Sequence, residues 1–226
     1  MLKTRVVLLG VLALFIASGV MTSSASASGP FWHVNGSLFS TGTKQIKLQS
    51  KGAAVLSLPS LKIEITCNNS ISEGSTIEGN GTSQGQGKGR ITYSSCKSNA
   101  AGCTVAEPIT TNPIKSYLAV AATQTKDVEV FEPGQGTLFV TLKLSGGSCL
   151  LAGSFEVTGG AVAELIPSGS EAQEGLLFFP KTPITKVKHE GVEKTVELKT
   201  KGLESAFTAA YGARLQTGEK YGVFET

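Results

Sequence analysis

The chain is poor in the residues from which most enzyme sites are built. Its 226 residues include two histidines, one tryptophan and a single aspartate, Asp127, alongside sixteen glutamates. Only 16% of the residues are charged, below the roughly 25% usual for globular domains, and the formal net charge is +3. This composition excludes an acidic disordered tail and a polybasic arm. We therefore expect no nucleic-acid partner.

The residues that bind metals are also scarce or badly spaced. A calcium loop of the EF-hand type needs Asp or Asn at alternate positions, and one aspartate cannot supply it. No C-x-x-C spacing occurs among the four cysteines, and the two histidines are far apart in the chain. The sequence therefore predicts no bound metal and no cofactor.

The N-terminus has the three parts of a secretory signal peptide. Lys3 and Arg5 precede an apolar run over residues 6–20, and the small residues 25–27 follow it. Fifteen apolar residues fall short of the roughly 20 that span a bilayer, so a membrane anchor is the weaker alternative. We predict a signal peptide over residues 1–27 and a secreted, extracellular protein with no membrane span after cleavage. Without Lys3 and Arg5 the mature net charge is +1.

The four cysteines are even in number and follow the predicted signal peptide: Cys67, Cys96, Cys103 and Cys149. An exported chain meets an oxidising compartment, where such a set forms two disulfides. Four thiols allow three connectivities, and the sequence alone does not choose among them. The preferred pairing is Cys67 with Cys96 and Cys103 with Cys149, because each cysteine ends a predicted strand.

Alternation of apolar and polar residues indicates many short strands. Residues 61–67 (LKIEITC) and 138–144 (LFVTLKL) place apolar side chains at every second position. Glycine-containing turn signals separate such runs at short intervals. The alanine-rich segments 113–124 and 205–215 are ambiguous between helix and strand, and we predict strands for both. The expected fold is all-β, an antiparallel β-sandwich or two-sheet meander with two disulfides.

The mature chain is predicted to form one domain over residues 28–226. Residues 167–171 (PSGSE) are the best candidate for an internal boundary. The tail after them has no cysteine, and a separate domain of about 60 residues without a disulfide would be marginally stable. We therefore expect the last strands to complete sheets that begin earlier.

The catalytic motifs that the sequence contains lack the flanking elements that they would need. Residues 81–85 (GTSQG) match the G-x-S-x-G of hydrolases, but that motif needs a strand before it and a helix after it. His33 is expected beside an N-terminal strand and His189 on a solvated hairpin. Glu64, Glu78, Glu129 and Glu156 occupy polar positions of predicted strands, so we expect all four to be exposed. No catalytic residue is nominated.

Aromatic residues offer the remaining route to a binding site. Carbohydrate-binding modules stack sugar rings on exposed aromatic side chains, and the candidates here are few. Trp32 and Tyr93 are the speculative ligand-binding residues, although aromatic rings more commonly fill a core.

Several short segments resemble those of poorly characterised secreted all-β proteins of high-GC Gram-positive bacteria. They are residues 31–36 (FWHVNG), 66–67 (TC), the pair Cys96 and Cys103, and residues 215–222 (LQTGEKYG). The resemblance implies an exported bacterial protein and carries no active-site motif.

These observations favour a non-enzymatic secreted or cell-envelope protein that serves as a structural or binding module. The alternative is a carbohydrate- or cell-wall-binding module that uses exposed aromatics, and a third hypothesis is a secreted hydrolase. Candidate partners are a cell-wall glycan or another surface protein.

Overall fold

A computed structural model describes residues 29–80, 85–124 and 126–225. The predicted signal peptide lies outside the described residues. The regular elements are one 3₁₀ turn and twenty strands: β1 (Pro30–Val34), β2 (Ser37–Leu38), β3 (Thr41–Ser50), β4 (Ala54–Leu58), η1 (Pro59–Leu61), β5 (Ile63–Asn80), β6 (Gln86–Ser98), β7 (Thr104–Val105), β8 (Ile109–Thr110), β9 (Ile114–Ala121), β10 (Asp127–Pro133), β11 (Leu138–Ser145), β12 (Gly153–Gly159), β13 (Ala161–Ile166), β14 (Glu171–Ala172), β15 (Gly175–Phe179), β16 (Lys186–His189), β17 (Val192–Thr195), β18 (Leu198–Thr200), β19 (Leu203–Leu215) and β20 (Tyr221–Glu225).

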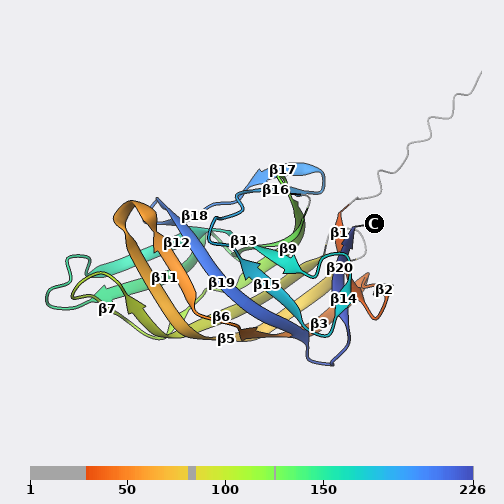
Figure 1. Ribbon diagram of the computed structural model, residues 1–226, viewed down its shortest axis with the longest axis horizontal. Coiled ribbons are helices and arrows are strands. Elements are labelled where there is room, and N and C mark those ends of the chain that lie inside the picture. The colour runs from red at the N-terminus through yellow and green to blue at the C-terminus, as the bar shows by residue number, and fades with distance from the viewer. Residues whose placement is uncertain (1–28, 81–84, 125, 226) are drawn as a thin grey trace, which may run out of the picture.

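The strands form a small sheet and a large one (Figure 1). The small sheet has the order β14-β20-β1-β2. In the large sheet, eight strands are hydrogen-bonded in the order β15-β13-β10-β9-β6-β5-β3-β19, and β19 pairs again with β15. The eight strands therefore form a closed antiparallel ring with no free edge.

Three long strands, β5, β6 and β19, run through both halves of the molecule. The ring lobe consists of β3, β9, β10, β13 and β15 with residues 71–80, 86–89 and 209–215 of the long strands. The disulfide lobe consists of β4, β7, β8, β11, β12 and β18 with residues 63–67, 91–98 and 203–208. Figure 1 shows the disulfide lobe at the left end and the small sheet at the right.

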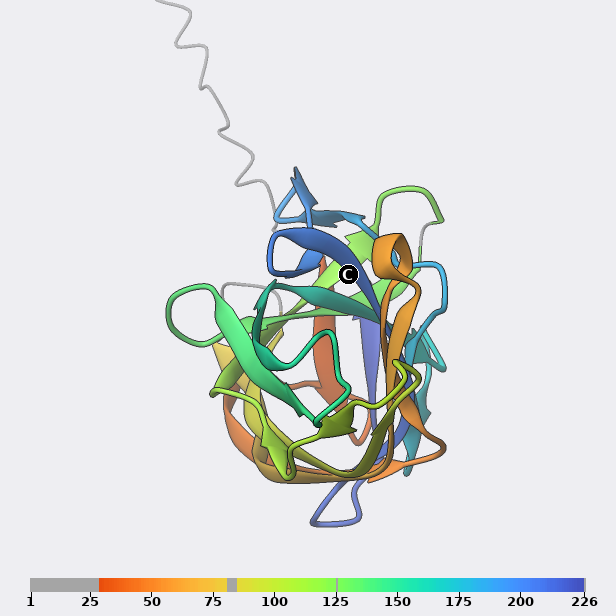
Figure 2. The same ribbon diagram turned by 90° about the vertical axis from the view of Figure 1, so that its left-hand side faces the viewer.

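The small sheet closes the far end of the ring. Figure 2, viewed from the disulfide lobe, shows β1 and β20 inside the outline of the surrounding strands. From β1, Trp32 packs with Leu118, Tyr211 and Val223 in the core of the ring lobe. A closed ring of eight strands has an interior just wide enough for side chains to fill, and Trp32 fills its end.

The disulfide lobe closes less completely. Its core includes Leu142, Phe155 and both cysteines of the Cys67–Cys96 pair. The connection over residues 104–112 spans the gap between β6 and β11, with strands of only two residues each. Single backbone hydrogen bonds complete the contact, from Ala106 to Lys143 at 2.9 Å and from Asn112 to Phe139 at 2.8 Å.

A hairpin of β16 and β17 covers the outer face of the ring beside β9. Val187 of β16 pairs with Ala121 and is fully buried. Beneath it, Val128 and Val130 of β10 are also fully buried. The strands β9 and β10 are therefore covered on both faces.

The all-β, antiparallel prediction is confirmed, and so is the preferred disulfide connectivity. Both ambiguous segments are strands, β9 and β19. Strands after the candidate boundary at residues 167–171 pair with earlier ones, β15 with β13 and β20 with β1. The sequence did not indicate that the large sheet closes on itself. Within the described ranges, no helix is long and apolar enough to cross a membrane.

Candidate ligand-binding site

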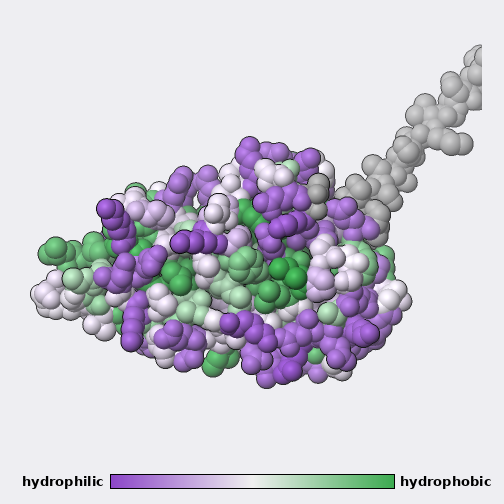
Figure 3. Space-filling model, viewed as in Figure 1, coloured by the Kyte–Doolittle hydropathy of each residue, from purple (hydrophilic) through white to green (hydrophobic). Residues whose placement is uncertain are grey.

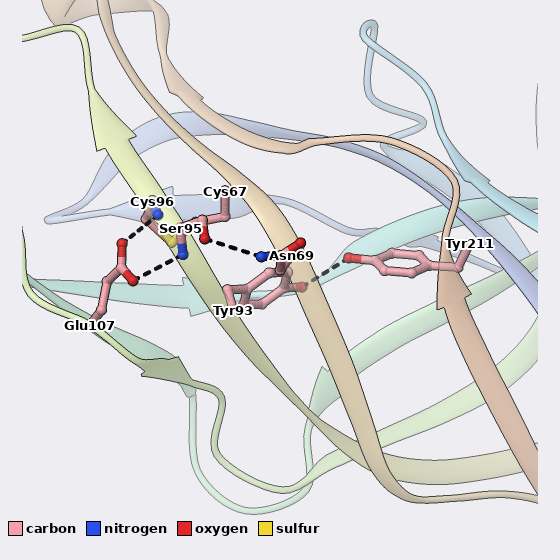
Figure 4. Close-up of a disulfide and its surroundings, with 7 residues drawn as sticks. All are labelled: Cys67, Asn69, Tyr93, Ser95, Cys96, Glu107 and Tyr211. Carbon is pink, nitrogen blue, oxygen red and sulfur yellow. Dashed lines mark hydrogen bonds between the residues drawn. A yellow bond between two sulfur atoms is a disulfide. The ribbon is translucent and has the colours of Figure 1, made fainter.

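The wall of the site is the pair of strands joined by the first disulfide (Figure 4). Cys67 of β5 and Cys96 of β6 are directly opposite in register, with their Cα atoms 3.9 Å apart. The carboxylate of Glu107 accepts hydrogen bonds from the backbone N–H of Ser95 at 2.9 Å and from that of Cys96. Asn69 donates from its amide to the Ser95 hydroxyl at 3.0 Å. The Glu107 contacts hold β6 against the connection that closes the lobe, and the disulfide and the Asn69 contact join β6 to β5.

Cys67 also lines an apolar cavity of about 80 Å³. In the same measure a single water needs roughly 10–15 Å³, and native interiors contain few voids larger than one water. The lining side chains are almost all aliphatic or aromatic: Ala54, Leu56, Ile65, Cys67, Ile91, Tyr93, Ile109, Thr111, Ile114, Phe131, Phe139, Val140, Leu142, Val157, Ala161, Phe179, Leu198 and Phe207. An apolar cavity of this size is suited to an apolar occupant rather than to ordered water.

The cavity lies where the two lobes meet. Ring-lobe residues Ile114, Phe131 and Phe179 line one part of it, and disulfide-lobe residues such as Leu142 and Val157 line the rest. Neither lobe alone would enclose the space. The cavity is therefore a product of fusing the two lobes through β5, β6 and β19.

A second hollow, of about 280 Å³, adjoins the cavity. The two share Ala161, Leu198 and Phe207 as lining residues. The second hollow is also lined by the connection between β15 and β16 and by the carboxylate residues Glu197 and Glu204. Figure 3 shows hydrophobic side chains at the surface over the middle of the molecule, near β15 and β19. We call this second hollow the mouth of the cavity.

Two tyrosines meet beside the cavity, Tyr211 buried and Tyr93 partly buried. The Tyr211 hydroxyl donates a hydrogen bond to the Tyr93 hydroxyl at 3.3 Å (Figure 4). Burial raises the pKa of both phenols, and for Tyr93 the charge and hydrogen bond of Tyr211 add to that effect. Both tyrosines are therefore neutral at physiological pH, and they leave the cavity wall without charge.

One glutamate expected on the surface lies inside the ring lobe. Glu129 of β10 is only 6% exposed, so the prediction that it faces solvent is wrong. Burial raises the pKa of its carboxyl to about 7, and a hydrogen bond from the Ser116 hydroxyl at 2.6 Å opposes that shift. Ser75 and Thr76 line the same hollow, which has a volume of about 40 Å³.

A second buried carboxyl lies on the same strand. Asp127 is 4% exposed and accepts a hydrogen bond from the Ser168 hydroxyl. Burial raises the pKa of this carboxyl, the hydrogen bond lowers it, and the nearby charge of Glu225 raises it again. Neither carboxyl lines the apolar cavity.

The speculative aromatic platform is not present at the surface. Trp32 is 2% exposed, and its indole N–H donates to the carbonyl of Gln86 at 3.0 Å. Tyr93 is packed edge-on against Phe207 with ring centroids 6.2 Å apart. Trp32 therefore belongs to the core of the ring lobe, the commoner role for an aromatic ring, and offers no exposed face to a sugar. Tyr93 is partly buried and forms part of the cavity wall.

Most of the G-x-S-x-G segment lies outside the described residues. The last residue of the motif, Gly85, packs directly against Trp32. A Cβ atom at this position would lie 2.3 Å from Trp32 Cδ1. Close packing against the indole therefore accounts for glycine at position 85.

The two histidines occupy different surroundings. The His33 ring packs against Phe224, with centroids 4.6 Å apart, on the small sheet. The His189 ring packs against Tyr117, with centroids 4.3 Å apart, on the β16–β17 hairpin. Across residues 29–80, 85–124 and 126–225, no three His, Cys, Asp or Glu side chains come together as metal ligands.

Sequence reasoning missed the cavity because its lining residues come from many separate strands. Phe131, Phe179 and Phe207 are three of the ten phenylalanines, and nothing in their local sequence distinguishes them from ordinary core residues. Comparison with known proteins adds no further guide, since no family model, curated protein or solved structure matches the chain.

Proposed function

We propose that this protein is an exported, non-enzymatic binding protein that holds a small apolar molecule in the cavity between its two lobes. The observation that carries the proposal is an apolar cavity of about 80 Å³ that shares three lining residues with a mouth of about 280 Å³. Binding sites for small molecules are concave, mostly apolar and largely preformed. We infer that a ligand enters from the mouth, past the three residues that line both hollows.

The chemistry of the wall indicates the class of ligand. The lining offers no charged side chain, and the Tyr93 hydroxyl is already engaged with Tyr211. A polar ligand would lose its hydrogen bonds to water without replacing them, which costs free energy. A neutral apolar molecule, or the apolar part of an amphiphile, meets no such penalty.

Export is supported by the N-terminal sequence pattern and by the two disulfides. Both disulfides join strands or connections of the disulfide lobe, Cys67 with Cys96 and Cys103 with Cys149. Structural disulfides persist in oxidising compartments and are rare in the cytosol. The disulfides of this lobe would remain oxidised in an extracellular or cell-envelope location.

Thermal unfolding with a panel of neutral apolar probes tests the proposal. Toluene, naphthalene and octan-1-ol should each be compared with the ligand-free oxidised protein. A molecule that binds only the folded state raises the melting temperature by mass action. We expect at least one probe to do so in a saturable manner.

A variant with a larger side chain between the cavity and its mouth tests whether the probe binds in the cavity. Ala161 lines both the cavity and its mouth, so Ala161→Leu should reduce affinity for the probe by about tenfold or more while the protein stays folded. The matched control is Ala106→Leu, at an exposed position of the same size. The proposal fails if no probe binds, or if both variants bind the probe as the unmodified protein does.

A further inference from the structure

A polar groove lies on the outer surface where β3 runs beside β5, close to the junction of the two lobes. Its volume is about 690 Å³, and it shares no lining residue with the apolar cavity or its mouth. The lining residues are Lys47, Leu48, Gln49, Ser50, Gly52, Asn68, Asn69, Ser70, Ile71, Ser72, Ser94 and Arg214. Figure 3 shows hydrophilic side chains gathered over this end of the molecule, at the lower right.

The groove results from an irregularity in strand pairing. β3 pairs with β5 from Thr41↔Asn80 to Gln45↔Thr76, and pairing resumes one residue out of step at Gln49↔Ile71. β3 then ends at Ser50, and β4 takes its place beside β5 from Ala54. A register shift bends a strand and interrupts the pairing, which leaves the surface hollowed at this point.

Two positive charges face each other at one side of the groove. Arg214 of β19 and Lys47 of β3 are directly opposite in register, and like charges in this arrangement destabilise a sheet. Within the described part of the chain, the ion pairs that form join other residues, and neither Lys47 nor Arg214 belongs to one.

The nearby acidic group does not cancel this charge. Glu174 lies close enough for the charge of Arg214 to lower the pKa of its carboxyl, but its principal partner is Lys51, at 2.5 Å. No aspartate or glutamate lines the groove itself. The local charge is therefore positive although the chain as a whole is close to neutral.

The rest of the groove offers neutral hydrogen-bonding groups. The side chains of Gln49, Asn68 and Asn69 supply amide donors and acceptors, and Ser94 supplies a hydroxyl. Ile71 is 64% exposed and provides an apolar surface between them. Amides and hydroxyls pair with the hydroxyls of a sugar, whereas the arginine fork pairs with a carboxylate or a phosphate.

We propose that this groove binds an acidic oligosaccharide, whose carboxylate or phosphate group lies between Lys47 and Arg214 and whose sugar hydroxyls contact the amides of β3 and β5. The bound anion relieves the repulsion between the two opposed cations. The groove shares no residue with the apolar cavity, so a variant that loses ligand binding at one site should keep binding at the other.

Titration calorimetry at 150 mM salt tests the site with three defined glycans. Oligogalacturonate carries carboxylates, poly(glycerol phosphate) bearing sugar substituents carries phosphates, and dextran is neutral. We expect binding of at least one acidic glycan and none of dextran. The two acidic probes distinguish a uronate ligand from a phosphate ligand. Equal binding of dextran, or binding of none of the three, overturns the proposal.

A charge-matched pair of double variants separates a specific site from general attraction. Lys47→Gln with Arg214→Gln should weaken acidic-glycan binding about tenfold or more, because a paired charge contact is lost. Lys181→Gln with Lys188→Gln removes the same charge from exposed lysines elsewhere and should change affinity less than twofold. Asn68→Ala, which keeps both cations, should weaken binding by a smaller factor. Equal losses in the two double variants would show diffuse electrostatic attraction and contradict the proposed site.

Discussion

The ring lobe and the disulfide lobe share three strands but are held together in different ways. The ring lobe is closed by hydrogen bonds all the way around, through the pairing of β15 with β19, and contains no cysteine. The disulfide lobe is closed only by single hydrogen bonds and two-residue strands over residues 104–112. Both disulfides lie in this second lobe.

The interior of the disulfide lobe is also less completely packed than the interior of the ring lobe. Trp32 fills the end of the ring lobe, which keeps a small hollow of about 40 Å³ beside Glu129, whereas most of the residues that line the apolar cavity belong to the disulfide lobe. Side chains that fill a space stabilise it through burial, and a cavity forgoes that stabilisation. Covalent links thus occur in the lobe where packing and pairing are weakest, and that lobe contributes most of the lining of the apolar cavity.

Removing Trp32 should have the largest effect, and it would act on the ring lobe. Trp32→Ala is expected to lower the free energy of unfolding by roughly 3–5 kcal/mol, since it empties the end of a closed ring. Chemical denaturation of the oxidised protein measures the loss. Trp32→Phe keeps an aromatic ring but loses the hydrogen bond to Gln86, so its loss should be smaller. A loss below about 1 kcal/mol for Trp32→Ala would mean that the ring does not depend on its cap.

Removing the second disulfide should have the next largest effect, on the other lobe. Cys103 and Cys149 are separated by 46 residues. Loop entropy for that separation predicts a loss of about 4 kcal/mol, within the usual range of 2–5 kcal/mol. The change is Cys103→Ser with Cys149→Ser, and the exposed neighbour Ser148→Ala is the control.

Hydrogen exchange shows where that loss falls. Amides of residues 98–112 and 138–153 should exchange faster in the double variant, while β9 and β10 keep their protection because their hydrogen bonds belong to the closed ring. Uniform loss of protection in both lobes would contradict the view that the two lobes are stabilised separately, because it would show that they unfold as one unit.

Glu129→Gln should have the third largest effect, and its sign depends on pH. The folded protein holds the Glu129 proton up to about pH 7, whereas a free carboxyl loses it near pH 4.5. The folded state therefore binds more protons between these values, so the free energy of unfolding falls by up to about 3 kcal/mol as pH rises from 4.5 to 7. Asp127, whose pKa is also raised, acts in the same direction.

The amide that Glu129→Gln introduces carries no charge and can still accept from Ser116, so this part of the pH dependence should disappear. The variant should match the unmodified protein near pH 4.5 and exceed its stability at pH 8. Glu156→Gln, at an exposed position of β12, is the control and should retain the full pH dependence. Identical pH profiles for Glu129→Gln and the unmodified protein would contradict the assignment.

The case of Glu129 shows what alternation in a sequence can and cannot predict. In β10 the pattern identified two faces correctly, with Val128 and Val130 on one and Glu129 on the other. The apolar face lies on the outside of the ring, under the β16–β17 hairpin, and the polar face points inward. A strand covered on both sides has no solvent face, and no local pattern reveals which side a distant hairpin will cover.

The same pattern worked where one face meets water. In β5, Ile63, Ile65 and Cys67 are buried and Glu64 is exposed, as the alternation predicted. Leu61, which the same pattern placed on the apolar face, lies in the 3₁₀ turn before the strand and is exposed. The position of Trp32 was not predictable for a different reason. Its short strand pairs with β20, at the opposite end of the described chain, and its indole N–H binds the carbonyl of Gln86 in another strand.

The sequence by itself determined the strands, the turns between them and an even set of cysteines, because period-two alternation and turn chemistry are local properties. Only the tertiary structure decided that β19 meets both β3 and β15, which closes the ring, and that the two lobes enclose an apolar cavity. It also set Lys47 opposite Arg214 in a chain of nearly neutral charge. These outcomes depend on pairings between residues far apart in the chain. Backbone hydrogen bonds of that kind are not encoded in the local sequence around either partner, so no local pattern predicts them.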